Sequence, residues 1–272
     1  MSGPFGTVLW TVDERPLITH LARMFFPFRD HNPSGRTPYV CWLLILANAL
    51  IFLGYWLTLP NERAINLFFY QWGLVPQFVM AGEQWHTVVT SMFLHGGWMH
   101  IIGNMLFLWV FGDNLEDQMG HLPFAMFYLV CGFAAAGLQI FADPASPVPM
   151  VGASGAIAGV LGGYLLLYPR ARVDVLIFFV IFIRVVPIPA WIVLGLWFGS
   201  QVISGFAMPT EGGGVAYWAH AGGFVAGVAL AVPFWLTRGG TRYWGQTHGV
   251  PPHPEAEYQI TRSRIPLVKR MR

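Results

Sequence analysis

Apolar residues occur along this chain in long runs, separated by short polar segments. Crossing the hydrocarbon core of a bilayer as a helix takes about 20 mostly apolar residues. Four runs reach this length, and two are slightly shorter, one of them rich in glycine. The six runs are residues 40–59, 87–112, 122–141, 151–168, 188–204 and 217–236. The pattern predicts an all-α membrane protein built as a bundle of six transmembrane helices.

One further apolar run, residues 175–183, is too short to span a bilayer. Arg184, Pro187 and Pro189 follow it directly, so we interpret it as an interfacial or hairpin segment that leads into the fifth helix. If it were a seventh span, the topology after residue 170 would be reversed.

The composition changes the picture by excluding whole classes of protein. Hydrophobic residues make up 55% of the chain and charged residues 10%, against about a quarter charged in soluble domains. A soluble enzyme and a disordered chain are therefore excluded, and the bilayer is the expected solvent. The formal net charge of +2 is too small for a general nucleic-acid binder. Cys41 and Cys131 both lie in apolar runs, so no disulfide framework is indicated.

Basic residues orient the six spans, because they concentrate on the cytoplasmic side of a membrane. One side would hold most of the arginines and the whole C-terminal tail, and the other side only Arg63. The basic side includes Arg15, Arg23, Arg29, Arg36, Arg170, Arg172, Arg184 and Arg238. The start of the chain lacks the pattern of a cleavable signal peptide. We expect a bacterial cytoplasmic (inner) membrane protein with both termini in the cytoplasm.

This orientation divides the chain into three parts. Residues 1–39 form a cytoplasmic segment, in which Leu17, Leu21, Met24 and Phe28 have the spacing of an interfacial amphipathic helix. An unstructured segment is nearly as compatible with these residues. Residues 40–236 form the six-span domain, and residues 237–272 form a basic cytoplasmic tail whose prolines and charges predict disorder.

Polar side chains inside the spans are few, and such residues default to functional hypotheses. They are Asn48, His95, His100, Asn104, Ser154, Ser200, Gln201 and His220. The second, fourth and sixth spans would all run from outside to inside. Ser154 and His220 each lie three residues after the start of their spans, roughly 5 Å below the outer boundary. We therefore expect them at the same depth.

Glycines on both spans explain how these two side chains could meet, because small residues let helix backbones approach closely. The supporting glycines are Gly152, Gly155 and Gly159 around Ser154, and Gly223 and Gly227 after His220. A serine hydroxyl must come within about 3 Å of the imidazole that activates it. The sequence predicts a nucleophile, Ser154, and a general base, His220. All acidic residues lie outside the spans, with Glu211 the nearest before His220, so a dyad is expected rather than a triad.

His100 and Asn104 are four residues apart and share one helix face, which suits two donors to an oxyanion. A metal site is the alternative interpretation. His95 and His100 would lie about 140° apart around a helix, and no carboxylate or cysteine joins them at useful spacing. A zinc or haem site is therefore not expected. We expect His95 to hydrogen-bond a loop near the outer interface.

Together these residues resemble the rhomboid family of intramembrane serine proteases, over roughly residues 40–236. The resemblance rests on His95-x4-His100-x3-Asn104, on Gly152-x-Ser154-Gly155 and on His220-x-x-Gly223-x-x-x-Gly227. The segment from Gly112 to Asp117, with Gly120 after it, is similar to a turn of that family that ends the second helix.

The resemblance implies a fold, an activity and a substrate class. The backbone N–H of Ser154 would join His100 and Asn104 in the oxyanion hole. Membrane-anchored proteins, often with a single span, would be cleaved near the outer membrane boundary without metal, ATP or other cofactor. The fifth helix, with Trp191, Trp197 and Phe198, would form a lateral gate, and residues 60–83 would form a long first loop.

Two residue patterns depart from the family. Some members place an aromatic ring one turn after the nucleophile to stack on the catalytic histidine, and here that residue is Ala158. The first loop also lacks the Trp-Arg pair of many members. Two other functions stay open: a non-catalytic relative that binds transmembrane helices, and a transporter that uses the polar residues as a pathway.

Overall fold

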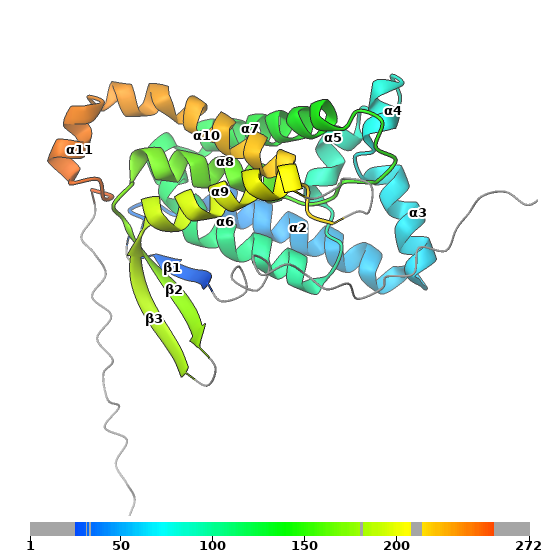
Figure 1. The fold of residues 1–272 in the computed structure, drawn as a ribbon, viewed down its shortest axis with the longest axis horizontal. Helices are drawn as coiled ribbons and strands as arrows, with labels where there is room; N and C mark the ends of the chain where they lie inside the picture. The colour runs from blue at the N-terminus through cyan, green and yellow to red at the C-terminus, as the bar shows by residue number, and fades with distance from the viewer. Residues whose placement is uncertain (1–24, 31, 33, 180–181, 208–213, 253–272) are drawn as a thin grey trace, which may run out of the picture.

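The computed structural model describes residues 25–30, 32, 34–179, 182–207 and 214–252 (Figure 1). Helices dominate these residues, and the longest ones pack side by side in one bundle. The bundle helices are α2 (Tyr39–Thr58), α6 (Trp98–Met119), α7 (His121–Ala142), α8 (Ser154–Leu167), α9 (Ala190–Ala207) and α10 (Tyr217–Thr237). Shorter elements are α3 (Glu62–Trp72), α4 (Pro76–Met80), α5 (Thr87–Thr90), η1 (Ser91–Phe93) and α11 (Thr241–Thr247).

Four of the described helices, α2, α7, α9 and α10, are long and apolar enough to cross a membrane. The other two bundle helices, α8 and α6, differ from these four in length and in charge, respectively. α8 has 14 residues, and every residue from Gly155 to Tyr164 is buried, so protein rather than lipid surrounds it. α6 has 22 residues but ends in a segment that carries Asp113, Glu116 and Asp117.

The second predicted span begins later and ends later than the sequence indicated. Residues 87–93 form the short elements α5 and η1, and α6 begins only at Trp98, after the extended backbone of Gly97. The expected turn from Gly112 onward is wrong, because α6 continues to Met119. It ends at Gly120, whose φ of 85° lies in the region that favours glycine.

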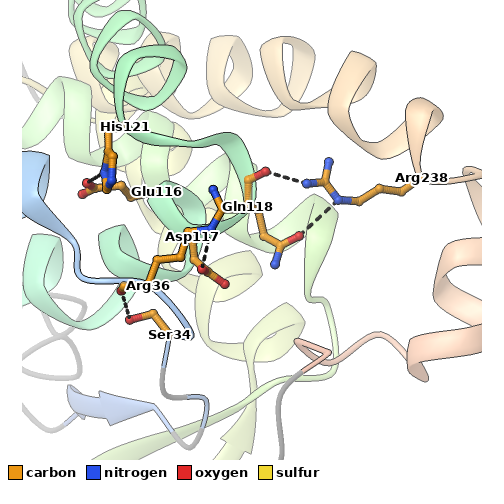
Figure 2. A network of polar contacts seen from close by, with 7 residues as sticks. All are labelled: Ser34, Arg36, Glu116, Asp117, Gln118, His121 and Arg238. Carbon is orange, nitrogen blue, oxygen red and sulfur yellow. Dashed lines mark hydrogen bonds and ion pairs between the residues drawn. The ribbon is translucent and has the colours of Figure 1, made fainter.

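The last turn of α6 ties several helix ends together (Figure 2). Glu116, whose exposed fraction is 1%, accepts hydrogen bonds from the backbone N–H groups of Val40 (2.9 Å) and Cys41 (2.8 Å). Its Oε1 also lies 2.6 Å from Nδ1 of His121. A carboxylate at the start of α2 stabilises that helix, because the first N–H groups of a helix lack partners within it. These contacts place Glu116 inside the last turns of α6, so the helix continues through this charged segment.

Three strands show that the fold is not all-α. β1 (Phe25–Asp30), β2 (Arg172–Phe179) and β3 (Phe182–Pro189) form one antiparallel sheet in the order β1-β2-β3. Residues 175–179 and 182–183 therefore lie on two strands that pair as a hairpin, as one of the two interpretations had it, and a seventh span is wrong. Phe28, expected in an interfacial helix, lies in β1 instead, and the rest of that expected helix is outside the described residues. The sheet forms because β2 and β3 are rich in β-branched and apolar residues, which favour strands, and because β1 pairs with β2.

The C-terminal tail is ordered where it meets the bundle. α11 forms at residues 241–247, Tyr243 is buried, and the indole N–H of Trp244 donates to the carbonyl oxygen of Leu166 (2.9 Å). Arg238 donates to both the side chain and the backbone oxygen of Gln118 (Figure 2). The expectation of disorder is wrong for these residues, because two aromatic side chains anchor them. Residues 253–272 lie outside the described part of the chain.

Candidate active site

The contact between α8 and α10 brings the candidate residues together. A Cβ atom at Gly223 would overlap the carbonyl oxygen of Gly155, and one at Gly227 would overlap that of Gly159. The two helices therefore touch through their backbones, at a distance that only glycine permits. Gly155 and Gly159 also face α7, where a Cβ would meet the side chains of Ala135 and Cys131.

Ser154 and His220 meet at the end of this contact. Ser154 is the first residue of α8, and His220 lies in the first turn of α10. The Oγ atom of Ser154 is 2.8 Å from Nε2 of His220, across a sequence separation of 66 residues. Both residues are half-buried, so the pair has one open side. A hydroxyl at hydrogen-bond distance from an imidazole nitrogen is the arrangement of an activated nucleophile.

His100 reaches the same place from α6. Its Nδ1 accepts a hydrogen bond from the backbone N–H of Gly96 (3.3 Å), which leaves the proton of a neutral imidazole on Nε2. A Cβ at Gly152 would lie 2.9 Å from that Nε2 and 3.3 Å from Oγ of Ser154. Gly152, with a φ of 137°, therefore belongs to a loop that admits the imidazole of His100, and its predicted role in helix packing is wrong.

Asn104 lies one turn after His100 on α6 and is almost fully buried. Its Nδ2 donates to the carbonyl oxygen of His100 (3.0 Å), so one of its two N–H groups stabilises its own helix. The N–H groups of the first turn of α8, including that of Ser154, lack acceptors within the helix. Two kinds of donor thus lie near Oγ of Ser154, a backbone N–H and the imidazole of His100, and the amide of Asn104 lies one turn further along α6.

His220 has a second hydrogen-bond partner that sequence reasoning missed. Its Nδ1 lies 2.7 Å from Oε1 of Gln201, and the ring centroid of Trp197 lies 5.7 Å away at an interplanar angle of 34°. Both residues come from α9. The sequence did show Gln201 as a polar residue in an apolar run, and that was the available signal. No aromatic side chain stands at Ala158 to hold the ring from α8.

His95 precedes α6 and is fully buried, so the argument from helix geometry that separated it from His100 is wrong. The rings of His95 and His100 pack edge to face, with centroids 5.1 Å apart. The hydroxyl of Tyr55 donates to the carbonyl oxygen of His95 (2.6 Å) and accepts from its backbone N–H (2.9 Å). Within the described ranges, no three His, Cys, Asp or Glu side chains converge as metal ligands. Glu211 lies outside those ranges.

Comparison with known proteins gives one consistent result. A family model described as the Rhomboid domain matches residues 82–237, more than half of the chain, and this segment includes every candidate site residue. Rhomboid protease GluP of Bacillus subtilis is 32% identical over 157 residues, 57% of this chain and 28% of that protein. Rhomboid protein 1, mitochondrial, of Saccharomyces cerevisiae is 28% identical over 165 residues, 58% of this chain and 45% of that protein.

A third relative matches over a greater length. Rhomboid-like protein 11, chloroplastic, of Arabidopsis thaliana is 28% identical over 211 residues, 76% of this chain and 68% of that protein. For the first curated relatives that it matches, however, the chain spans less than half of the length. It covers 33% of RHOMBOID-like protein 5 of Arabidopsis thaliana and 45% of the yeast protein.

Proposed function

This chain belongs to the rhomboid family, and we propose that it is an intramembrane serine endopeptidase with Ser154 as nucleophile and His220 as general base. One observation carries the proposal. Oγ of Ser154 lies 2.8 Å from Nε2 of His220 at the place where two helices touch through glycine backbone. A protein that only bound helices would have no need for this pair beside several oxyanion donors.

The proposed reaction follows from the hydrogen-bonding groups of the site. His220 takes the proton of Ser154 as Oγ attacks the scissile carbonyl carbon, and it then passes that proton to the leaving amine. The negative charge that develops on the carbonyl oxygen is stabilised by the backbone N–H of Ser154 and by Nε2–H of His100. Asn104 supplies the remaining N–H of its amide. Water then attacks the ester formed on Oγ, and His220 takes a proton from that water and returns it to Oγ as the new carboxyl end leaves, which restores Ser154 and His220.

The proposed membrane arrangement has six spans within residues 40–236. α2, α7, α9 and α10 have the length and composition of spans, and α6 and α8 would cross the membrane inside the bundle that they form. We propose that the termini, residues 1–39 and 237–272, lie in the cytoplasm, on the bias of arginines alone. We propose further that the membrane is a bacterial cytoplasmic membrane. Reporter fusions after α10 and before α8 test this orientation, because the two should report opposite sides.

The proposed substrates are membrane-anchored proteins, often with a single span, cut near the outer boundary of the bilayer. The dyad lies at the N-terminal ends of α8 and α10, at one end of the bundle, which supports a cut near one membrane surface. We propose that substrate enters beside α9, because Ala190, Leu194 and Gln201 are the buried residues of this helix and most of its surface faces outward.

The deciding experiment combines chemical labelling with one substitution. Purified protein is treated with a fluorophosphonate, and the modified residue is identified by mass spectrometry. We expect labelling at Ser154. Ser154→Ala should abolish both labelling and the cleavage of a single-span substrate, a loss of at least about 10⁴-fold, while the melting temperature changes little. Unchanged cleavage by Ser154→Ala would reject the protease assignment. A wild-type protein that binds single-span helices without labelling would instead be a non-catalytic relative.

A further inference from the structure

His220 is held from two directions by α9, the helix that supplies neither the proposed nucleophile nor the base. Nδ1 of His220 lies 2.7 Å from Oε1 of Gln201, while Nε2 faces Ser154. We propose that Gln201 is a positioning residue that fixes the tautomer of His220, and that Trp197 fixes the plane of its ring. This inference rests on the proposed protease function.

The tautomer follows from the chemistry of the amide oxygen. Oε1 of a glutamine accepts hydrogen bonds and cannot donate one. The nitrogen that faces it, Nδ1, must therefore carry the proton of the neutral imidazole. Nε2 is then left with its lone pair, 2.8 Å from the hydroxyl oxygen of Ser154. A general base needs that lone pair in order to accept the hydroxyl proton.

The orientation of the Gln201 amide is itself determined by its neighbours. Its Nε2 donates to Oγ of Ser200 (3.1 Å) and lies 3.4 Å from the carbonyl oxygen of Trp197. Oγ of Ser200 donates its own proton to that same carbonyl (2.6 Å), so it offers a lone pair to Gln201. Exchanging the amide oxygen and nitrogen would turn an acceptor toward the carbonyl of Trp197 and a donor toward Nδ1. The network therefore favours the orientation in which Oε1 faces His220.

Trp197 and Gln201 are four residues apart and lie on one face of α9. The ring of Trp197 is tilted by 34° against that of His220, with centroids 5.7 Å apart, and limits rotation of the imidazole. The side chain of Ala158 on α8 is too small to fill this role. One turn of α9 thus supplies a contact to the face of the ring and a contact to its edge.

The burial of Gln201 supports a specific role. Its exposed fraction is 9%, and the other buried residues of α9 are Ala190 and Leu194, both apolar. An amide buried in an apolar span is costly unless its groups are hydrogen-bonded. The plain alternative is that Gln201 only attaches α9 to α10. The experiment must separate attachment from control of the base.

The rate of fluorophosphonate labelling at Ser154, measured against pH in detergent micelles, separates the two roles. Gln201→Leu removes the acceptor with little change in volume, and we expect labelling about 10- to 100-fold slower, since a misdirected base loses its alignment. Gln201→Glu keeps an acceptor beside Nδ1 and adds a negative charge, which favours the protonated imidazole. The labelling rate should then stay close to that of the wild type at high pH, and the acidic limb of its profile should move to higher pH.

The control variant is Gly199→Ala, on the same helix, where an added Cβ meets nothing within 4 Å. We expect it to have the rate and pH profile of the wild type. A Gln201→Leu variant that labels as fast as the wild type would overturn the positioning role. If Gln201→Leu does not fold, Gln201→Glu decides: an unshifted profile overturns the proposal, and a shifted one supports it. A wild-type protein that is not labelled at Ser154 rejects the protease assignment, which is a separate failure.

Discussion

α6 carries polar residues at both of its ends, and the two groups are built on opposite principles. The Glu116 cluster consists of Glu116 with its partners Val40, Cys41 and His121, at the C-terminal end. Figure 2 shows Glu116 and His121 of this cluster. The Ser154 cluster consists of Ser154, His220, Gln201, His100 and Asn104, around the N-terminal end. The first contains a carboxylate and is closed. The second contains no acidic or permanently basic side chain, and its two reacting atoms lie on half-buried residues.

The difference shows how to separate structural polar groups from reactive ones inside an apolar bundle. Both oxygens of Glu116 accept from N–H groups of α2, one also contacts His121, and the residue is 1% exposed, so a ligand has no access to it. In the Ser154 cluster, the hydroxyl, Nε2–H of His100 and the first N–H groups of α8 retain hydrogen-bonding capacity on the open side. A buried and fully paired group holds the fold, whereas a half-buried group with unused capacity can bind and react.

Separating the two helices that carry Ser154 and His220 should have the largest effect on cleavage. Gly223→Ala would place a methyl group against the carbonyl oxygen of Gly155 and force α8 and α10 apart. We expect cleavage of a single-span substrate to fall by more than about 10²-fold, because a displacement of about 1 Å between reacting groups already has an effect of that size. Stability should also fall by about 1–3 kcal/mol, through overpacking.

Gly54→Ala is the matched control, since Gly54 lies within α2 and an added Cβ there meets nothing within 4 Å. Its cleavage rate should equal that of the wild type, and its stability should be equal or slightly higher. If Gly223→Ala retained the wild-type cleavage rate, the glycine contact would have no part in aligning Ser154 with His220.

His100→Ala tests the open side of the Ser154 cluster and has the next largest expected effect. It removes a donor whose proton is directed by the N–H of Gly96. We expect kcat to fall by about 10²-fold with a smaller change in KM, because an oxyanion donor acts mainly in the transition state. Steady-state kinetics with a detergent-solubilised substrate measure the split. A rise in KM at unchanged kcat would assign His100 to substrate binding instead.

The two clusters also differ in what the sequence could predict of them. Long apolar runs predicted the helices of the bundle, and glycines four residues apart led us to expect close contact between the helices of Ser154 and His220. Gln201 was visible as a polar residue, but its partner depends on how α9 is rotated against α10. The sequence of an apolar helix that is exposed on most sides does not determine this rotation.

The start of α6 was missed because a hydropathy run averages over Gly96 and Gly97. A hairpin was one of the two interpretations of residues 175–183, but the pairing of β1 with β2 was missed because these strands are distant in sequence.

Glu116→Gln should change cleavage least, and it tests whether the Glu116 cluster serves stability alone. An amide has one oxygen where the carboxylate has two, so one of the N–H groups of Val40 and Cys41 loses its acceptor, and the charge that favours the start of α2 is lost. We expect a loss of about 2–3 kcal/mol in unfolding free energy, measured by titration in mixed micelles. Cleavage per folded molecule should stay within about twofold of the wild type, because Glu116 is about 24 Å along the helix from His100.

Glu62→Gln is the control, because it makes the same change at an exposed residue of α3. It should alter the free energy of unfolding by less than about 0.5 kcal/mol. A large loss of cleavage by folded Glu116→Gln would mean that the two ends of α6 are coupled and that the Glu116 cluster is more than a helix anchor.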